Sequence, residues 1–190
     1  EVPKEFKIND NLIVAPIKDG SDIDIIRGPN IQPFPKSDAL GEEVMGKVLI
    51  KVGDDITTDH IMPSNAKLLP YRSNIPYLAD YCFVPCDPEF PKRAKENGGG
   101  IIIGGFNYGQ GSSREHAALA PLYLGIRVVI AKSFARIHKQ NLINNGILPL
   151  VFENERDFDC IDLLDELVVE KASYQIEGNK VTIKNRTKKE

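Results

Sequence analysis

The chain has 190 residues, of which 42% are hydrophobic and 27% are charged, and its formal net charge is −3. This balance is typical of a globular domain and excludes wholesale disorder. Because acidic residues outnumber basic ones, nucleic acid is a disfavoured partner. The longest apolar runs, such as 101–103 and 128–131, fall far short of the roughly 20 residues that span a bilayer, so a membrane partner is not expected.

The three cysteines, Cys82, Cys86 and Cys160, do not form the even, closely spaced set of a secreted disulfide framework. Further metal ligands are absent at short spacing around Cys82 and Cys86, and Cys160 is too remote for a recognised iron–sulfur spacing. The sequence therefore predicts reduced structural thiols, no metal bound by this chain, and a cytoplasmic location. The first residue is Glu1 and no basic-then-apolar leader follows, so we expect a segment of a longer polypeptide.

Residues 1–43 alternate short apolar runs with turn-forming residues, for example Asp19-Gly20-Ser21 and Gly28-Pro29-Asn30. Proline and glycine at this density prevent long helices. We therefore expect an extended linker arm over 1–43, draped over a surface, and a folded domain over 44–190.

Beyond the arm, strands and helices alternate. Apolar runs bounded by glycine predict buried strands, and Gly or Asn-Gly steps predict helix ends. The predicted strands are 47–52, 101–105, 127–131, 147–152 and 167–169, with a hairpin over 173–183. The predicted helices are 92–96, 117–124, 133–144 and 158–164, with a polar loop at 57–64 and irregular structure over 65–91. This order predicts an α/β fold, a mixed sheet with a parallel βαβ core.

The strongest site signal is the turn Gly109-Gln110-Gly111, which leads into Ser112-Ser113-Arg114 and the next helix. The glycines allow close approach of a ligand, and a helix start offers unpaired N–H groups to an anion. Arg114 adds a planar fork suited to a carboxylate, and a serine alkoxide can be stabilised by nearby N–H groups. Alternatively, Ser112 or Ser113 is only the helix cap, with Glu115 completing a capping interaction. The glycine spacing disfavours dinucleotide binding.

Weaker signals lie elsewhere in the chain. Asp59 and His60 point in different directions, so one of them can reach a cleft, although an Asx-turn with a solvated histidine is equally consistent. Arg72 lies in a proline-framed loop and carries no weight alone. His116 and His138 are interpreted as structural histidines with satisfied hydrogen bonds, and Ser133 as a helix cap.

Three segments strongly resemble the C-terminal swivelling domain of aconitases. They are Asp54–Ile61, Asn107–Leu119 and Lys132–His138, and the resemblance runs from about residue 44 to 169 in the family's order. The second motif is shared with isopropylmalate isomerase small subunits, which tend to carry another residue pair where this chain has Asp59-His60. The aconitase branch is therefore favoured, and residues 27–31 resemble the linker before this domain in full-length aconitases.

The resemblance implies a swivelling β/β/α domain that closes over a [4Fe–4S] cluster held by other domains. It also implies the tricarboxylic acid cycle reaction, in which citrate is dehydrated to cis-aconitate and rehydrated to isocitrate. Ser112 matches the family's serine base, and Arg72, Ser113 and Arg114 match its substrate-carboxylate contacts. Asp59 matches an aspartate that pairs with a catalytic histidine from outside the domain, and His60 follows it. The resemblance therefore implies that Ser112, Asp59 and His60 are the catalytic residues.

Cys82, Cys86 and Cys160 do not match the family's cluster cysteines. We therefore expect this chain to bind no cluster, to be inactive alone, and to act with cluster-bearing domains or a large subunit. Two alternatives remain. One is the small subunit of an isopropylmalate or homoaconitate isomerase. The other is an RNA-binding regulatory aconitase module, which the acidic balance and the unclustered aromatic residues disfavour.

Overall fold

A six-stranded sheet with the order β4-β3-β2-β1-β5-β6 organises the chain. The computed structural model describes residues 3–189, so Glu1, Val2 and Glu190 lie outside the description. The strands are β1 (Val44–Lys51), β2 (Gly100–Gly104), β3 (Ile126–Ala131), β4 (Leu148–Val151), β5 (Glu166–Val169) and β6 (Lys184–Asn185). Strands β1 to β4 pair in parallel, whereas β5 pairs antiparallel with β1 and β6 antiparallel with β5. The predicted mixed sheet with a parallel βαβ core is confirmed.

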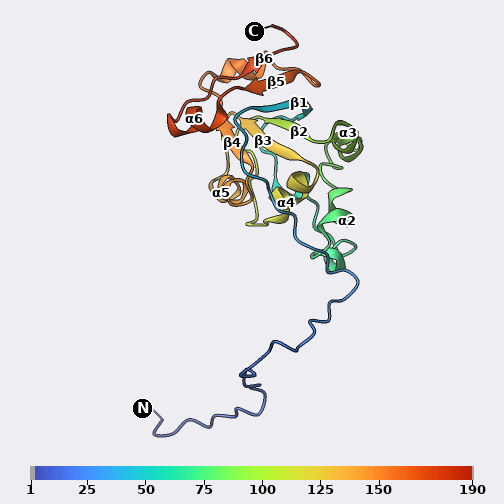
Figure 1. Cartoon of the computed structure of the whole chain (residues 1–190), viewed down its shortest axis with the longest axis vertical. Coiled ribbons are helices and arrows are strands. Elements are labelled where there is room, and N and C mark those ends of the chain that lie inside the picture. Colours follow the sequence, from blue (N-terminus) through green and yellow to red (C-terminus); the bar gives the residue numbers. More distant parts are fainter. Residues whose placement is uncertain (1–2, 190) are drawn as a thin grey trace.

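Six short helices connect these strands. They are α1 (Thr58–Ile61), α2 (Ile75–Ala79), α3 (Phe90–Asn97), α4 (His116–Tyr123), α5 (Arg136–Asn144) and α6 (Ala172–Glu177), with 3-10 turns at Leu69–Tyr71 and Glu155–Phe158. Figure 1 shows α2, α4 and α5 on one side of the strands, and α6, β5 and β6 toward the other end of the domain.

The hydrophobic core lies on both faces of the parallel strands. Ile102 packs in the cluster that includes the buried residues of α2, α3 and α4, whereas its neighbours Ile101 and Ile103 pack in a second cluster on the opposite face. Because successive side chains of a strand point to opposite faces, a strand covered on both sides needs an uninterrupted apolar run. This explains why 101–103 is continuous rather than alternating.

The arm has two parts. Residues 3–43 include no helix or strand in the described structure, and Figure 1 shows the first part extending away from the domain. The second part, which includes Gln32 and Ser37, touches the domain. The backbone N–H of Gln32 donates to the Ser73 carbonyl over 3.0 Å, and the Ser37 hydroxyl donates to the Gly146 carbonyl over 3.4 Å. The expected draping is therefore seen only near the domain. Strand β1 begins where we set the boundary, and the independence of 44–190 stays a prediction.

Four predictions of local structure are wrong. The segment 65–91 is not irregular throughout, because it contains α2 and the turn at Leu69–Tyr71. The loop at 57–64 contains α1, and the helix expected over 158–164 is replaced by the earlier turn at Glu155–Phe158, which the Asn154 side chain caps. The hairpin over 173–183 is absent, since this segment begins with α6. Strand β6 instead pairs with β5 at the edge of the sheet. The side-chain amide of Asn185 there donates to the buried Asp165 carboxylate over 2.7 Å. Residues 177–179, which predicted the hairpin turn, instead form the end of α6, with Gly178 as its C-cap.

Candidate active site

The loops after the carboxyl ends of β1, β2 and β3 are held side by side. Isolated bridges join Thr57 to Gln110 and Tyr108 to Phe134, so strand-like pairing continues past the sheet. The Gly109 amide also donates to the Ile56 carbonyl over 2.7 Å. The three segments that resemble aconitases therefore meet beyond the carboxyl ends of the parallel strands, where open α/β folds bind ligands.

The Ser112 side chain forms a hydrogen bond with the Thr58 hydroxyl and does not cap a helix. Helix α4 begins only at His116, after Glu115, and its N-cap makes no side-chain hydrogen bond. The Ser112 hydroxyl lies 3.1 Å from the hydroxyl of Thr58, which is buried. The preceding turn reaches this position with positive φ angles at Gly109 (82°) and Gly111 (110°). The capping interpretation of Ser112 and Ser113 is therefore wrong.

Arg114 is anchored at one end. Its Nη1 donates to the Asp59 carboxylate over 2.8 Å and to the Met62 carbonyl over 2.9 Å. Within the described residues these contacts use Nη1 alone, so the remaining guanidinium N–H groups are available to a ligand. Asp59 also accepts the Ser64 amide over 3.3 Å and thus orients the arginine while closing a turn.

His60 takes part in a helix cap. The Thr57 amide donates to His60 Nδ1 over 3.1 Å, and the His60 amide donates to the Thr57 hydroxyl over 3.0 Å. This is a capping box in which histidine replaces the usual Glu or Gln. Because Nδ1 accepts a hydrogen bond, the neutral ring carries its proton on Nε2.

A cavity of about 440 Å³ brings most of the predicted site residues together. Its lining residues are Met62, Pro63, Ser64, Leu68, Leu69, Arg72, Leu78, Ser112, Ser113, Arg114, Glu115 and His116. The His116 ring ties two of its walls together, since Nε2 lies 2.8 Å from the Arg72 carbonyl. Asp59 reaches the cavity through Arg114, whereas His60 is not among the lining residues.

The cavity lining has a polar part, which includes two serines and two arginines, and an apolar part (the apolar wall), which includes Met62, Leu68 and Leu78. The polar part can hold carboxylates and take up a proton. Sequence reasoning missed the apolar wall and Thr58. Only the adjacency of Thr58 to Asp59 in the first resembling segment signalled its involvement.

The two structural histidines differ. His116 has a hydrogen-bond partner, as expected. His138 is buried, but neither ring nitrogen has a hydrogen-bond partner among the described residues, so the prediction of a satisfied histidine is wrong. Burial lowers the pKa of His138 to about 4, which keeps the ring neutral. Ser133 is not the cap of α5 either, because α5 follows Ala135 and the Ser133 hydroxyl accepts the Asn107 amide over 2.8 Å.

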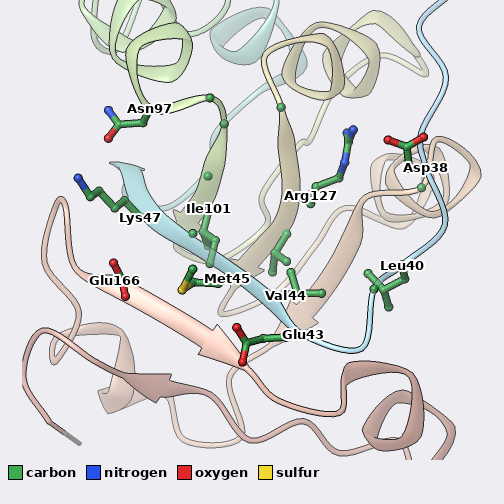
Figure 2. Close-up of a pocket in the computed structure, with 18 of the residues that line it drawn as sticks. Asp38, Leu40, Glu43, Val44, Met45, Lys47, Asn97, Ile101, Arg127 and Glu166 are labelled. Atoms are coloured by element: carbon green, nitrogen blue, oxygen red, sulfur yellow. The ribbon is translucent and has the colours of Figure 1, made fainter.

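A larger hollow of about 670 Å³ lies at the amino ends of the same strands. Figure 2 shows Lys47, Arg127, Asp38, Glu43 and Glu166 around it. The predicted site residues do not line this hollow. The smaller cavity, in which the predicted serines and arginines converge, is therefore the candidate active site.

The cysteines and the metal-ligating residues form no cluster in the described part of the chain. Cys82 is buried, Cys86 and Cys160 are exposed, and all three thiols are free. Burial raises the pKa of the Cys82 thiol. Between residues 3 and 189, no three His, Cys, Asp or Glu side chains are placed to hold a metal ion. A helix long and apolar enough to cross a bilayer is also missing from this part of the chain.

The chain is a mixed α/β domain of which two serines and two arginines line a cavity beyond the carboxyl ends of the parallel strands. The family described as "Aconitase C-terminal domain" matches residues 88–155. The chain is 43% identical to the methanogen homoaconitase small subunit of Methanocaldococcus jannaschii, an alignment that covers 73% of this chain and 78% of that protein. It is 34% identical to a probable mitochondrial aconitate hydratase of Caenorhabditis elegans, in an alignment that covers 95% of this chain and 26% of that protein.

A solved structure of a relative has a similar fold. The crystal structure of 3-isopropylmalate dehydratase from Methanocaldococcus jannaschii matches with a TM-score of 0.60 and 34% identity, over 75% of this chain and 82% of that chain. The chain belongs to the aconitase C-terminal domain family, which confirms the resemblance. It spans most of the small-subunit relatives but only about a quarter of the aconitate hydratase that it matches.

Proposed function

We propose that this chain supplies the proton-abstracting serine and the carboxylate-binding arginines of an aconitase-type hydro-lyase. The observation that carries the proposal is the convergence of Arg72, Ser112, Ser113 and Arg114 in one cavity. Its homologues are hydro-lyases, named as aconitate hydratases and 3-isopropylmalate dehydratases. The substrate is a hydroxylated di- or tricarboxylic acid. Two guanidinium groups suit the binding of carboxylates, and the serine suits removal of a proton from the carbon beside a carboxylate.

In the proposed reaction, the arginines bind the substrate carboxylates and fix the reacting carbon beside Ser112. Ser112 reacts as its alkoxide, which accepts the proton from this carbon and becomes the neutral hydroxyl; the C–H electron pair becomes the new double bond, and the hydroxyl on the neighbouring carbon leaves as water with a proton supplied from outside this chain. Thr58, 3.1 Å from Ser112, can donate a hydrogen bond that stabilises the alkoxide before it takes up the proton. Addition of water with the opposite regiochemistry completes the isomerisation.

The residues of this chain do not fit an iron–sulfur cluster. Cys82 is buried while Cys86 and Cys160 are exposed, and the part of the chain that the structure describes has no three-ligand group. We therefore place the [4Fe–4S] cluster expected for the family on the partner and route no step of the reaction through this chain's thiols.

The partner we propose is a cluster-bearing large subunit or the cluster-bearing domains of the same protein. The free arm supports this, because several of its large apolar side chains are exposed, among them Phe6, Leu12, Val14 and Ile26. Apolar side chains in such density mark an interaction surface. Free thiols in all three cysteines fit a reducing compartment, and we propose the cytoplasm.

Two observations favour different substrates. The alignment with small subunits of homoaconitase and 3-isopropylmalate dehydratase covers most of those proteins, and the apolar wall of the cavity suits a substrate with an alkyl group. The alignment with aconitate hydratase instead covers 95% of this chain, most of the arm included, which favours citrate and isocitrate.

The test is reconstitution with the cluster-bearing partner, followed by assays with 2-isopropylmalate, homocitrate and citrate. We expect turnover of one of these acids only when both parts are present. The chain alone should develop no visible iron–sulfur absorbance after anaerobic treatment with iron and sulfide. Absence of turnover with every acid in the loaded complex would contradict the proposal.

A further inference from the structure

Helix α5 lies behind the serine turn and presents a row of polar side chains to it. His138, Asn141 and Asn145 are three and four residues apart, so they share one side of this helical segment. None of the three lines the candidate active site. Each nevertheless touches the segment 109–115 that carries Ser112, as the following contacts show.

The His138 ring is pressed against the backbone of the turn. A Cβ atom added to Gly109 would lie 2.1 Å from Cδ2 of His138, so only glycine fits at this point. Gly109 also has a φ of 82°, which side chains rarely adopt. The ring of Tyr108 also packs against His138, with the two ring centroids 5.5 Å apart. The start of the turn is therefore fixed by contact with α5.

The other two side chains hold the end of the turn by hydrogen bonds. Nδ2 of Asn141 donates to the Ser113 carbonyl over 3.3 Å. Nδ2 of Asn145 donates to the Glu115 carboxylate over 3.1 Å. Among the described residues the Ser112 side chain makes one hydrogen bond, with the Thr58 hydroxyl, so its backbone position depends on these flanking supports.

Burial of His138 is unfavourable by itself. Both ring nitrogens are buried without partners in the described structure, and a hydrocarbon side chain would fill the space without that cost. The ring, however, lies so close to the Gly109 backbone that a Cβ atom on Gly109 would meet Cδ2, Cγ and Cβ of His138, so a side chain of another shape at position 138 would change this contact. The unfavourable burial is thus coupled to the shape of the turn.

We propose that His138, Asn141 and Asn145 are positioning residues that set the placement of Ser112 toward the reacting carbon. This inference rests on the proposed role of Ser112 as the proton acceptor. A shift of a reacting group by about 1 Å can cost about 100-fold in rate, so a support outside the cavity can affect turnover strongly.

The test compares two isosteric changes on the same helix. Asn141→Asp removes the Nδ2 donor and places an oxygen against the Ser113 carbonyl. Gln140→Glu is the matched control, because Gln140 is exposed and its side chain, within residues 3–189, bonds only to Asn144 on the same helix. In the reconstituted enzyme we expect Asn141→Asp to lower kcat about 10-fold with KM within about two-fold, and Gln140→Glu to leave both unchanged.

Two further readouts separate positioning from general support. In the Ser112→Ala background, Asn141→Asp should cause no additional loss, since its effect acts through Ser112. Below the pKa of the carboxyl group that Asn141→Asp introduces, the protonated group can donate again, so the activity ratio of Asn141→Asp to Gln140→Glu should rise toward acidic pH. Hydrogen exchange on the chain alone should show faster exchange at 109–114 in Asn141→Asp.

Three results would overturn the inference. An unchanged kcat in Asn141→Asp, beside an inactive Ser112→Ala, would reject it and leave the proposed function intact. Additive losses in the double variant would assign Asn141 to general stability. Full activity of Ser112→Ala would reject the proposed function and this inference together.

Discussion

The two ends of the parallel strands differ in what they offer a ligand. At the carboxyl ends, long loops bring serine, arginine and histidine side chains around a cavity of about 440 Å³. At the amino ends, the larger hollow is bordered by helix-ending glycines and scattered charges. A Cβ atom on Gly99 would lie 2.2 Å from the Gly125 carbonyl oxygen, so the connections there are packed backbone to backbone. Converging chemistry, rather than volume, therefore distinguishes the candidate site.

The largest expected effect breaks the carboxyl-end site. Ser112→Ala should lower kcat by about 100- to 10,000-fold with KM within a few-fold, because loss of a proton acceptor acts on the transition state. Steady-state kinetics of the reconstituted enzyme measure this. Thr58→Val, which removes only the supporting hydroxyl, should have a smaller effect. Wild-type kinetics in Ser112→Ala would reduce this residue to a partner of Thr58.

The next effect separates the two arginines of the site. Lysine at position 72 or 114 keeps the charge but loses the bidentate fork, which should cost about 2–4 kcal/mol in kcat/KM. The melting temperature should fall only in Arg114→Lys, because Arg114 also bridges Asp59 and the Met62 carbonyl. Parallel measurements of kinetics and thermal unfolding test this. Equal melting temperatures with full activity in both variants would remove the arginines from the site.

A smaller effect concerns stability against pH behind the turn. The pKa of His138 is lowered to about 4 by burial, whereas an unfolded histidine titrates near 6.5. The unfolded state therefore binds the extra proton first. The contribution of His138 to stability is complete above about pH 6.5 and falls by about 1.4 kcal/mol per pH unit down to about pH 4.

Urea unfolding at pH 7, 5.5 and 4.5 measures this slope. The free energy of unfolding of His138→Leu should depend less on pH over this window. His116→Gln is the control and should keep the wild-type slope, because His116 lies at the cavity with a hydrogen-bond partner. Identical slopes in the wild type and His138→Leu would show that another group controls the acid sensitivity.

The smallest effect is expected at the amino ends. Lys47→Gln and Arg127→Gln change charges around the larger hollow without touching the serine turn. We expect kcat/KM within about two-fold of the wild type, since surface charge changes away from a site have small effects. A ten-fold loss in either variant would contradict the contrast between the two ends.

The sequence predicted the strands well and the helix starts poorly. Uninterrupted apolar runs bounded by glycine, such as 101–103, leave few alternatives to a buried strand, and β2 is found there. Serine before an apolar segment is an ambiguous signal. Ser112 and Ser133 look like caps, yet their hydroxyls meet Thr58 and the Asn107 amide, groups brought in by the tertiary fold. Similarly, the Asn185–Asp165 contact that replaces the hairpin joins residues twenty positions apart.

For the site, resemblance carried further than local pattern. Arg72 and Ser112 lie far apart in the sequence, and nothing in their spacing predicts a shared cavity. The chain between Met62 and Leu78, which contains the turn at Leu69–Tyr71 and most of α2, packs on the core and supplies Arg72 and the apolar lining of the cavity. The catalytic and substrate-binding roles of the site residues stay predictions.

The pairing of β1 with β5 has a consequence for how the protein is made. Val44 pairs with Val169, so a central strand must wait for a partner synthesised more than a hundred residues later. Such long-range contacts slow folding, and an unpaired strand edge is prone to bind other chains meanwhile. During translation, β1 can pair with β2 early but keeps its second edge open until Glu166–Val169 leave the ribosome. A product truncated before Glu166 would therefore be an aggregation-prone sheet rather than a smaller working domain.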